Sequence, residues 1–139
     1  KADMIEAEDW DGITALCKEA MKAIHGFTFA HVGINNDNAD KAMEAAKLFE
    51  LFGFAMKVGN SSIFSSSEVE IMKKPYLGTH GHIGIKTYNV DRALAYLKQF
   101  GFEPNMETAG YLGEPGKSGL KVVYLNKEIG GFAIHLLKA

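Results

Sequence analysis

The sequence has a single cysteine, Cys17, no apolar run near the roughly 20 residues of a membrane helix, and no excess of either charge. One cysteine excludes an internal disulfide and favours a reducing, cytoplasmic location. The net charge of -2 offers no basic surface for nucleic acid or for an anionic membrane. No secretory signal is recognisable. These absences favour a soluble domain whose partners are small molecules or other proteins.

What is present is ordinary for a globular protein. The 139 residues are 47% apolar and 23% charged, which suffices for one domain with a real core and falls short of two full ones. The chain begins at Lys1 and lacks an initial methionine. We therefore expect a fragment, a processed form or an incomplete start.

A four-residue motif occurs twice, as His31-Val32-Gly33-Ile34 and as His82-Ile83-Gly84-Ile85. Each copy lies in a run whose apolar residues alternate with histidine and glycine. A period of two is typical of a strand in a half-buried sheet. The β-branched face of each strand is expected to pack on helices, and the opposite face carries a histidine beside a glycine.

The elements around the two motifs repeat as well. Phe52-Gly53-Phe54 ends one predicted helix, and Phe100-Gly101-Phe102 ends the other. A repeat of about 50 residues predicts two modules, residues 27–74 and 80–139, each a βαβββ unit. The fold class is therefore α+β, with the paired modules forming a curved, cupped mixed sheet and the helices on its outer face. The first module is predicted as a strand at 27–35, a helix from an Asn36 or Asp37 cap to 52, and strands at 54–58, 60–67 and 69–73. The second is predicted as a strand at 80–87, a helix from an Asn89 or Asp91 cap to 100, and strands at 102–108, 120–125 and 131–138, with a loop at 110–119 and a turn at 126–130.

The first 26 residues are predicted to form a helical tail. Asp9 and Asp11 suit its start, and Gly26 suits its end. An apolar stripe with helical spacing runs along it and must be buried against something. It consists of Ile13, Leu16, Cys17, Ala20, Met21 and Ile24.

Four residues able to bind a metal fall at equivalent positions in the two modules. His31 and His82 open them, and Glu70 and His135 lie in the aligned closing strands. Imidazole and carboxylate together suit Zn, Ni, Co, Mn or Fe, which predicts one divalent ion. His80, on the same strand face as His82, is a substitute ligand or a hydrogen-bond partner of one. The alternative is a hydrogen-bonded polar cluster without a metal. We interpret His25 as solvated or linked to the helix dipole.

From residue 27 onward, the chain resembles the vicinal oxygen chelate superfamily, the glyoxalase-like fold of paired βαβββ modules. The resemblance rests on the two His-x-Gly-Ile motifs, the Phe-Gly-Phe helix ends and the positions of Glu70 and His135. It implies a divalent metal that chelates two neighbouring oxygens of a substrate and stabilises developing negative charge. In glyoxalase I the closing strand of the second module usually carries a Glu that also acts as the base. His135 in that place puts the isomerase chemistry in doubt and leaves dioxygenase and lyase chemistry open.

The segment from Met4 to Thr14 resembles the C-terminal helix of 2-keto-3-deoxy-6-phosphogluconate or 4-hydroxy-2-oxoglutarate aldolases. The resemblance implies that residues 1–26 end a preceding aldolase domain and that 27–139 form a C-terminal glyoxalase-like domain. The alternative is an unrelated amphipathic helix that packs on the sheet domain.

Two functions are open. One is a metal-dependent lyase or isomerase that acts on a small oxo- or hydroxy-acid, with Tyr111, Glu114 and Lys117 of the glycine-rich loop closing over the substrate. The other is a non-catalytic module that binds a metabolite, regulates the aldolase or forms a homo-oligomer.

Overall fold

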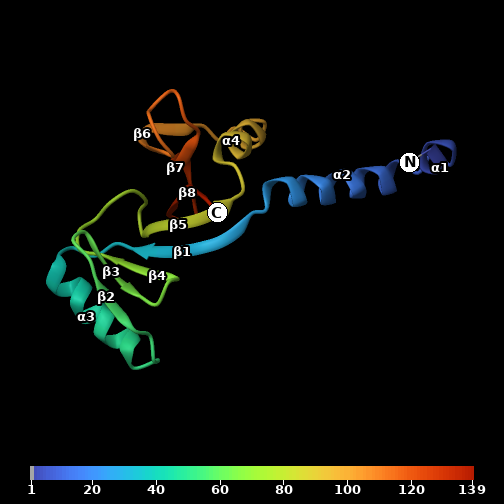
Figure 1. The fold of residues 1–139 in the computed structure, drawn as a ribbon. Helices are drawn as coiled ribbons and strands as arrows, with labels where there is room; N and C mark the ends of the chain where they lie inside the picture. Colours follow the sequence, from blue (N-terminus) through green and yellow to red (C-terminus); the bar gives the residue numbers. More distant parts are fainter. Residues whose placement is uncertain (1) are drawn as a thin grey trace.

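The computed structural model describes residues 2–139; Lys1 lies outside them. A helical arm at the N-terminus projects from a domain of sheet and helices (Figure 1). The arm consists of α1 (Ala2–Glu6) and α2 (Trp10–His25). The tail is helical as predicted, and Asp9, one of the two residues predicted at the start, caps α2 by accepting a hydrogen bond from the Gly12 amide. Glu8, with a positive φ of 53°, separates α1 from α2. Gly26 ends α2 in the left-handed conformation, as predicted.

The domain is built on one sheet of 8 strands in the order β2-β3-β4-β1-β5-β8-β7-β6. The strands are β1 (Thr28–Ile34), β2 (Met56–Val58), β3 (Ser62–Ser65), β4 (Val69–Met72), β5 (Gly81–Thr87), β6 (Pro104–Tyr111), β7 (Leu120–Ile129) and β8 (Phe132–Lys138). The order is symmetrical: β1 and β5 pair antiparallel at the centre, and each is flanked by the closing strand of its own module in parallel. The predicted pair of βαβββ modules is confirmed.

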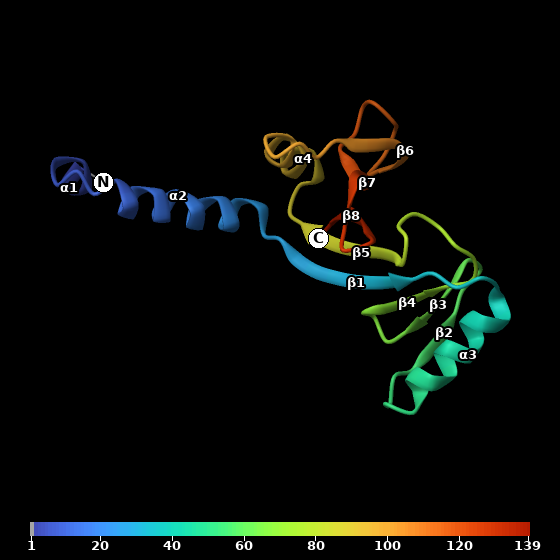
Figure 2. The same ribbon diagram turned by 180° about the vertical axis from the view of Figure 1, so that it is seen from behind.

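One helix covers each half of the sheet on its outer side (Figure 2). These are α3 (Ala39–Glu50) and α4 (Val90–Lys98). Asn89 caps α4 as predicted, whereas α3 is capped by Asn38 and not by Asn36 or Asp37. Gly53 and Gly101 follow the two helices with φ of 83° and 77°, which explains the repeated Phe-Gly-Phe ends.

Two apolar clusters lie between the helices and the sheet. Alanines of α3 and α4 let each helix approach the isoleucines, leucines and valines of the strands closely. The cluster under α3 contains Ala42, Ala46, Ile63 and Ile71. The cluster under α4 contains Val90, Ala93, Leu120, Val123, Leu125, Ile134 and Leu136. Because strand residues alternate, the opposite face of the sheet is left for polar side chains.

Two strands of the second module, β6 and β7, end later than the sequence predicted. β6 continues to Tyr111, and β7 continues through the predicted turn at 126–130 to Ile129. The turn itself is only Gly130 and Gly131, whose φ values of 59° and 81° suit a two-residue hairpin. Within residues 2–139, no helix has the length and apolarity needed to cross a membrane.

Candidate metal centre

The four candidate ligands come from the four central strands, and the pairing register brings them together. In one row across the sheet, Gly33 of β1 lies between Glu70 of β4 and His82 of β5. In the next row, Gly84 of β5 lies between His31 of β1 and His135 of β8. Each glycine therefore separates two ligand candidates on the cupped face. The prediction that His31 and His82 face the same cavity is confirmed.

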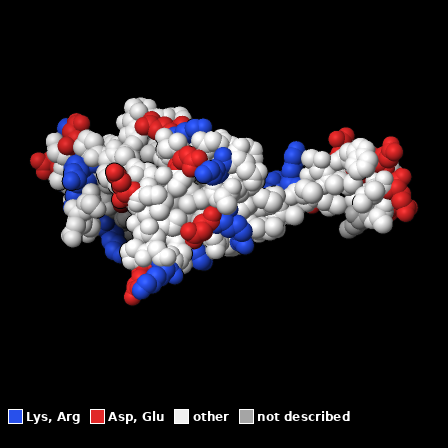
Figure 3. All heavy atoms as spheres, turned by 90° about the horizontal axis from the view of Figure 1, so that it is seen from above, with Lys and Arg blue, Asp and Glu red and all other residues white. Residues whose placement is uncertain are grey.

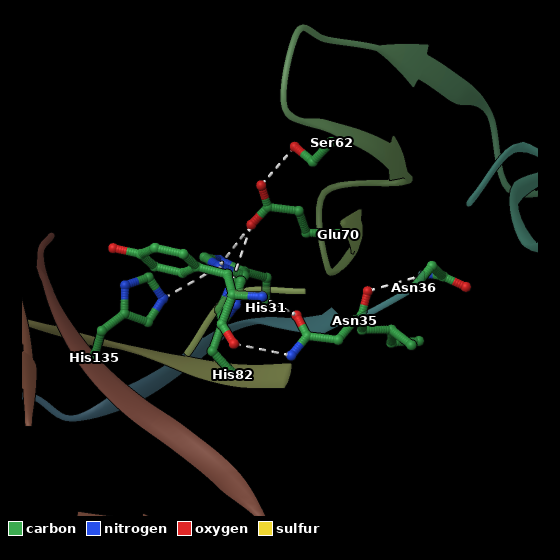
Figure 4. Close-up of polar contacts among 9 residues, drawn as sticks. His31, Asn35, Asn36, Ser62, Glu70, His82 and His135 are labelled. Carbon is green, nitrogen blue, oxygen red and sulfur yellow. Dashed lines mark hydrogen bonds and ion pairs between the residues drawn. The ribbon is translucent and has the colours of Figure 1, made fainter. Parts of the chain in front are cut away.

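The ligand atoms converge (Figure 4). Nε2 of His31 lies 3.2 Å from Nε2 of His82 and 3.2 Å from Nε2 of His135. Oε2 of Glu70 lies 3.1 Å from Nε2 of His82 and 3.4 Å from Nε2 of His31. Nitrogen and oxygen ligands at about 2.0–2.2 Å from a divalent ion are separated from one another by about 3–3.5 Å, so these four spacings suit such an ion. The ligand atoms of His31, His82 and His135 all lie within 4.8 Å of one another.

The electrostatics favour neutral imidazoles beside an ionised carboxyl. Burial, and then the neighbouring His82 and His31, lower the pKa of His135 to about 3. Burial also lowers the pKa of His31, against the pull of Glu70. Burial acts to raise the pKa of Glu70, but hydrogen bonds with His82 and Ser62 outweigh it and leave that pKa below its usual value. Neutral imidazole and carboxylate are the protonation states that bind metal ions.

The two nitrogens of each buried ring are used differently. Nδ1 of His82 and Nδ1 of His135 are buried and have no hydrogen-bond partner among the described residues. The second ring nitrogen of a ligating histidine normally has an acceptor too, so these atoms do not distinguish a metal site from a hydrogen-bonded cluster. What supports a metal is that the contacts of both rings are concentrated on the Nε2 side, toward the other donors.

Three residues beside the cluster escaped the sequence analysis. Ser62 Oγ donates to Oε1 of Glu70 over 2.6 Å and so holds the carboxylate in place. The Tyr124 ring stacks on His135 at 4.5 Å between centroids, and burial raises the pKa of its phenol well above the usual value. The Phe64 ring meets His31 edge-on at 6.0 Å. For Ser62 and Phe64 the available signal was strand alternation, because they lie two residues apart on β3; Tyr124 lies beside His135 through the pairing of β7 with β8.

His80 and His25 lie apart from this cluster. His80 is exposed, and its ring packs against Phe132 at 5.7 Å between centroids. His25 was interpreted as solvated or linked to the helix dipole, and the first alternative is wrong: it is 1% exposed, stacks on Phe27 and lies against the Tyr96 ring. Its ring lies at the junction of the arm and the domain, between Phe27 and Tyr96 of α4.

The three loop residues do not reach the cluster either. Tyr111 is in β6 and packs against the apolar cluster under α4. Glu114 and Lys117 form an ion pair of 2.7 Å with each other and are exposed. Across residues 2–139, no hydrogen bond or ion pair joins this loop to the histidines.

Comparison with known proteins finds relatives in structure only. No family model matches the sequence, and no curated protein matches it. Methylmalonyl-CoA epimerase from Streptomyces coelicolor, in complex with 2-nitronate-propionyl-CoA, is 16% identical, with a TM-score of 0.51 over 79% of this chain and 92% of that one. Methylmalonyl-CoA epimerase from Mycobacterium tuberculosis is 17% identical, with a TM-score of 0.49 over 78% and 85%.

A variant of homoprotocatechuate 2,3-dioxygenase from B. fuscum is 12% identical, with a TM-score of 0.50 over 78% of this chain. The match takes up 31% of that dioxygenase, so this chain spans less than a third of its length. Similarity at such low identity concerns the fold. Together with the paired βαβββ modules and the symmetrical strand order, it shows that the chain has the vicinal oxygen chelate fold that the sequence motifs resemble.

Proposed function

We propose that His31, Glu70, His82 and His135 bind one divalent transition metal, and that the domain acts on a small oxo- or hydroxy-acid as a lyase or isomerase. The observation that carries the proposal is that the ligand atoms of His31, His82 and His135 lie within 4.8 Å of one another, and that one Glu70 oxygen lies 3.1 Å and 3.4 Å from two of the Nε2 atoms. Zn, Ni, Co, Mn and Fe all accept this donor set. The four side chains come from both modules, so the ion joins them.

A divalent ion in this position supplies a Lewis acid for two neighbouring oxygens of a substrate. The chain itself supplies the surroundings. The Tyr124 phenol keeps its proton and is a hydrogen-bond donor beside the cluster. Phe64 and Tyr124 wall the histidines on two sides, which restricts water near the reacting atoms.

Elemental analysis tests the metal directly. The protein is incubated with Zn, Ni, Co or Mn, desalted, and measured beside a variant carrying His31→Ala and His82→Ala. We expect about one ion per chain in the wild type and none in the variant. His135→Ala is expected to bind more weakly, because three donors remain. A wild type without metal would leave the four residues as a polar cluster.

The reaction class is tested by hydrogen exchange. A Lewis acid at the two oxygens of a 2-oxo acid makes the hydrogens on the carbon next to the carbonyl more acidic. The loaded protein is therefore incubated with 2-oxo acids in D2O, and deuterium incorporation at that carbon is followed by NMR. Exchange that requires the metal supports catalysis.

One observation favours a non-catalytic binding module as the second candidate. Glu70 is the one carboxylate in the cluster as far as residues 2–139 show, and both of its oxygens are engaged, by Ser62 and by the histidines. No free base is left over. Ligand-induced stabilisation without any exchange would support a metabolite-binding, regulatory or oligomerisation role.

We also propose that residues 1–26 are the end of an aldolase domain and that 27–139 are the C-terminal domain of the fusion, in the cytoplasm. The support is the arm itself: it projects from the rest of the chain (Figure 3), and of the residues of α2 only His25 is buried, so most of the apolar stripe is exposed. The single Cys17 is a free, exposed thiol, which suits a reducing compartment. An aldolase assay on the protein expressed from its natural gene, with sedimentation to give its oligomeric state, tests this proposal.

A further inference from the structure

The cupped face extends past the metal ligands over β2 and β3 into a cavity of about 640 Å³. Its wall is polar on one side and aromatic on the other. The residues that line it include Lys57, Asn60, Ser61, Ser62, Phe64 and Ser67. Ser62 and Phe64 also border the candidate metal centre, through Glu70 and His31 respectively. The cavity and the cluster therefore share a wall.

The strand register fixes the distance between the two. Lys57 of β2 is paired with Phe64 of β3, and Phe64 is paired with Glu70 of β4. The three side chains thus lie in one row on the same face of the sheet. Two strand spacings separate Lys57 from Glu70, which is about 10 Å between backbones. The aliphatic part of the Lys57 side chain covers part of this distance. A ligand with a short carbon chain is therefore long enough to reach from the metal ligands to the Lys57 ammonium group.

The polar groups of the cavity are not equally free. The hydroxyls of Ser66 and Ser67 donate to Glu68, and that of Ser62 donates to Glu70. The Lys57 ammonium, in contrast, has no acidic partner among the described residues. Asn60 and Ser61 also make no side-chain hydrogen bond there. One cation and two neutral polar groups are available to a ligand.

We propose that this cavity binds the distal anionic group of a dianionic 2-oxo or 2-hydroxy acid, and that Lys57 pairs with that group. This inference rests on the proposed function, because the two neighbouring oxygens at the other end face the metal ligands. It narrows the substrate class to acids with a second carboxylate or a phosphate. A cation beside free polar groups in a concave site is suited to an anion.

The test compares ligands that differ only at the distal end. The Zn-loaded protein is titrated calorimetrically with 2-oxopentanoate, 2-oxoglutarate and 3-phosphohydroxypyruvate. All three have the same 2-oxo acid group, and the second and third add a carboxylate and a phosphate. We expect the wild type to prefer a dianion by about 10-fold, the order of effect of a charge-assisted hydrogen bond. Whichever of 2-oxoglutarate and 3-phosphohydroxypyruvate binds more tightly identifies the distal group as a carboxylate or a phosphate.

Lys57→Gln is expected to lose this preference and to bind 2-oxopentanoate as the wild type does. Lys74→Gln, the matched control, removes an equal charge from an exposed residue outside the cavity and is expected to keep the preference. Lys57 lies on an edge strand, where a lysine also serves to prevent edge-to-edge pairing. If that is its role, Lys57→Gln keeps the wild-type preference and the inference is wrong.

The metal-free protein separates this inference from the proposed function. Suppose that elemental analysis finds no metal but the wild type still binds 2-oxoglutarate more tightly than 2-oxopentanoate, and Lys57→Gln does not. The proposed function is then wrong, and the inference about the cavity is supported. If metal binds and no ligand distinguishes Lys57→Gln from wild type, the cavity inference fails and the metal centre stands. Circular dichroism of each variant confirms that the fold is retained.

Discussion

Gly33 of β1 lies directly opposite His82 of β5, and the His82 imidazole occupies the space where a Cβ of residue 33 would be. The second copy of the motif repeats this arrangement. A Cβ on Gly84 would lie 2.7 Å from Nε2 of His135 and 2.8 Å from Cε1 of His31. In each motif the histidine supplies a candidate ligand, and the glycine leaves room for the histidine of the other motif across the β1–β5 pair.

Gly33→Ala is therefore expected to weaken metal binding without unfolding the domain. The added methyl group forces the His82 imidazole to move, and a ligand displaced by even a fraction of an ångström no longer matches its partners. We expect the metal dissociation constant to rise by at least 10-fold. Competition with a chromophoric chelator measures it.

Gly113→Ala is the matched control for this glycine. A Cβ there would lie 3.4 Å from the Cβ of Ser118, an ordinary contact, and the residue is in the exposed turn after β6. It is expected to bind metal as the wild type does. Equal affinity in Gly33→Ala and Gly113→Ala would show that His82 is not a ligand.

The metal-free protein is expected to lose stability in acid. An unfolded histidine binds a proton near pH 6.5, whereas folded His135 resists protonation until about pH 3, and folded His31 also has a lowered pKa. The unfolded state then binds more protons, so the free energy of unfolding is highest above pH 6.5 and falls as pH is lowered. Each such histidine contributes a slope of about 1.4 kcal/mol per pH unit.

Glu70 extends this loss to lower pH. Its folded pKa is below its usual value of 4.5, so its stabilising effect is present above that value and is lost as pH falls through the folded pKa. Urea unfolding at several pH values in the presence of EDTA measures the slope for the wild type and for His135→Leu. The variant is expected to have the shallower slope. Parallel curves would mean that His135 is protonated as easily in the fold as out of it.

Ser62→Ala is expected to weaken metal binding while leaving the ligand set complete. The Ser62 hydroxyl donates to Oε1 of Glu70 and leaves Oε2 facing the histidines. Without this bond the carboxylate is free to rotate, and its pKa rises. Loss of such an outer hydrogen bond typically costs about 10- to 100-fold in metal affinity. Ser66→Ala, which removes a hydroxyl that bonds Glu68 instead, is the control; an equal effect of both would assign the change to the loop.

The two central strands and the four ligand candidates followed from the sequence because they depend on local information. Strand alternation gives the face of each residue, and the internal repeat aligns Glu70 with His135. The contact that the sequence analysis missed, between Tyr124 and His135, depends on which strands are neighbours and in what register they pair. Tyr124 meets His135 only because β7 pairs with β8 with a register shift between Tyr124 and Glu128. Nothing local to residue 124 encodes that pairing.

The cap of α3 shows a second limit. Asn36, Asp37 and Asn38 are chemically similar as helix caps, so propensity cannot choose among them. Tertiary contacts decide: the Asn35 side chain accepts from the Tyr76 amide at 3.1 Å and donates to the Gly78 carbonyl at 2.9 Å. This fixes the end of β1 to the linker between the modules, and the chain reaches helical geometry only after Asn38, which accepts from the Lys41 amide.

Removal of residues 2–23 is expected to leave the sheet domain folded. Ile13, Leu16, Cys17 and Ala20 are not buried, and the stripe of α2 contributes little to the core in this chain. Among residues 2–139, the hydrogen bonds between the domain and the arm lie at its end. Thr87 Oγ1 and the Tyr88 amide donate to the His25 carbonyl over 2.7 Å and 3.0 Å, and Arg92 Nη2 donates to the Ile24 carbonyl over 2.8 Å. A deletion that stops before Ile24 spares these three contacts.

The melting temperature of this deletion is expected to lie within about 2 °C of the full chain, because little buried surface is lost. His25→Ala in the full chain provides the contrast. It removes a fully buried ring that stacks with Phe27 and Tyr96, and a vacated space of that size costs about 2–4 kcal/mol. Differential scanning calorimetry of the full chain, the deletion and His25→Ala, all without metal, gives the change in melting temperature for each variant. A large drop on deletion, matching that of His25→Ala, would mean that the stripe of α2 supports the sheet domain and would remove the physical support for an aldolase partner.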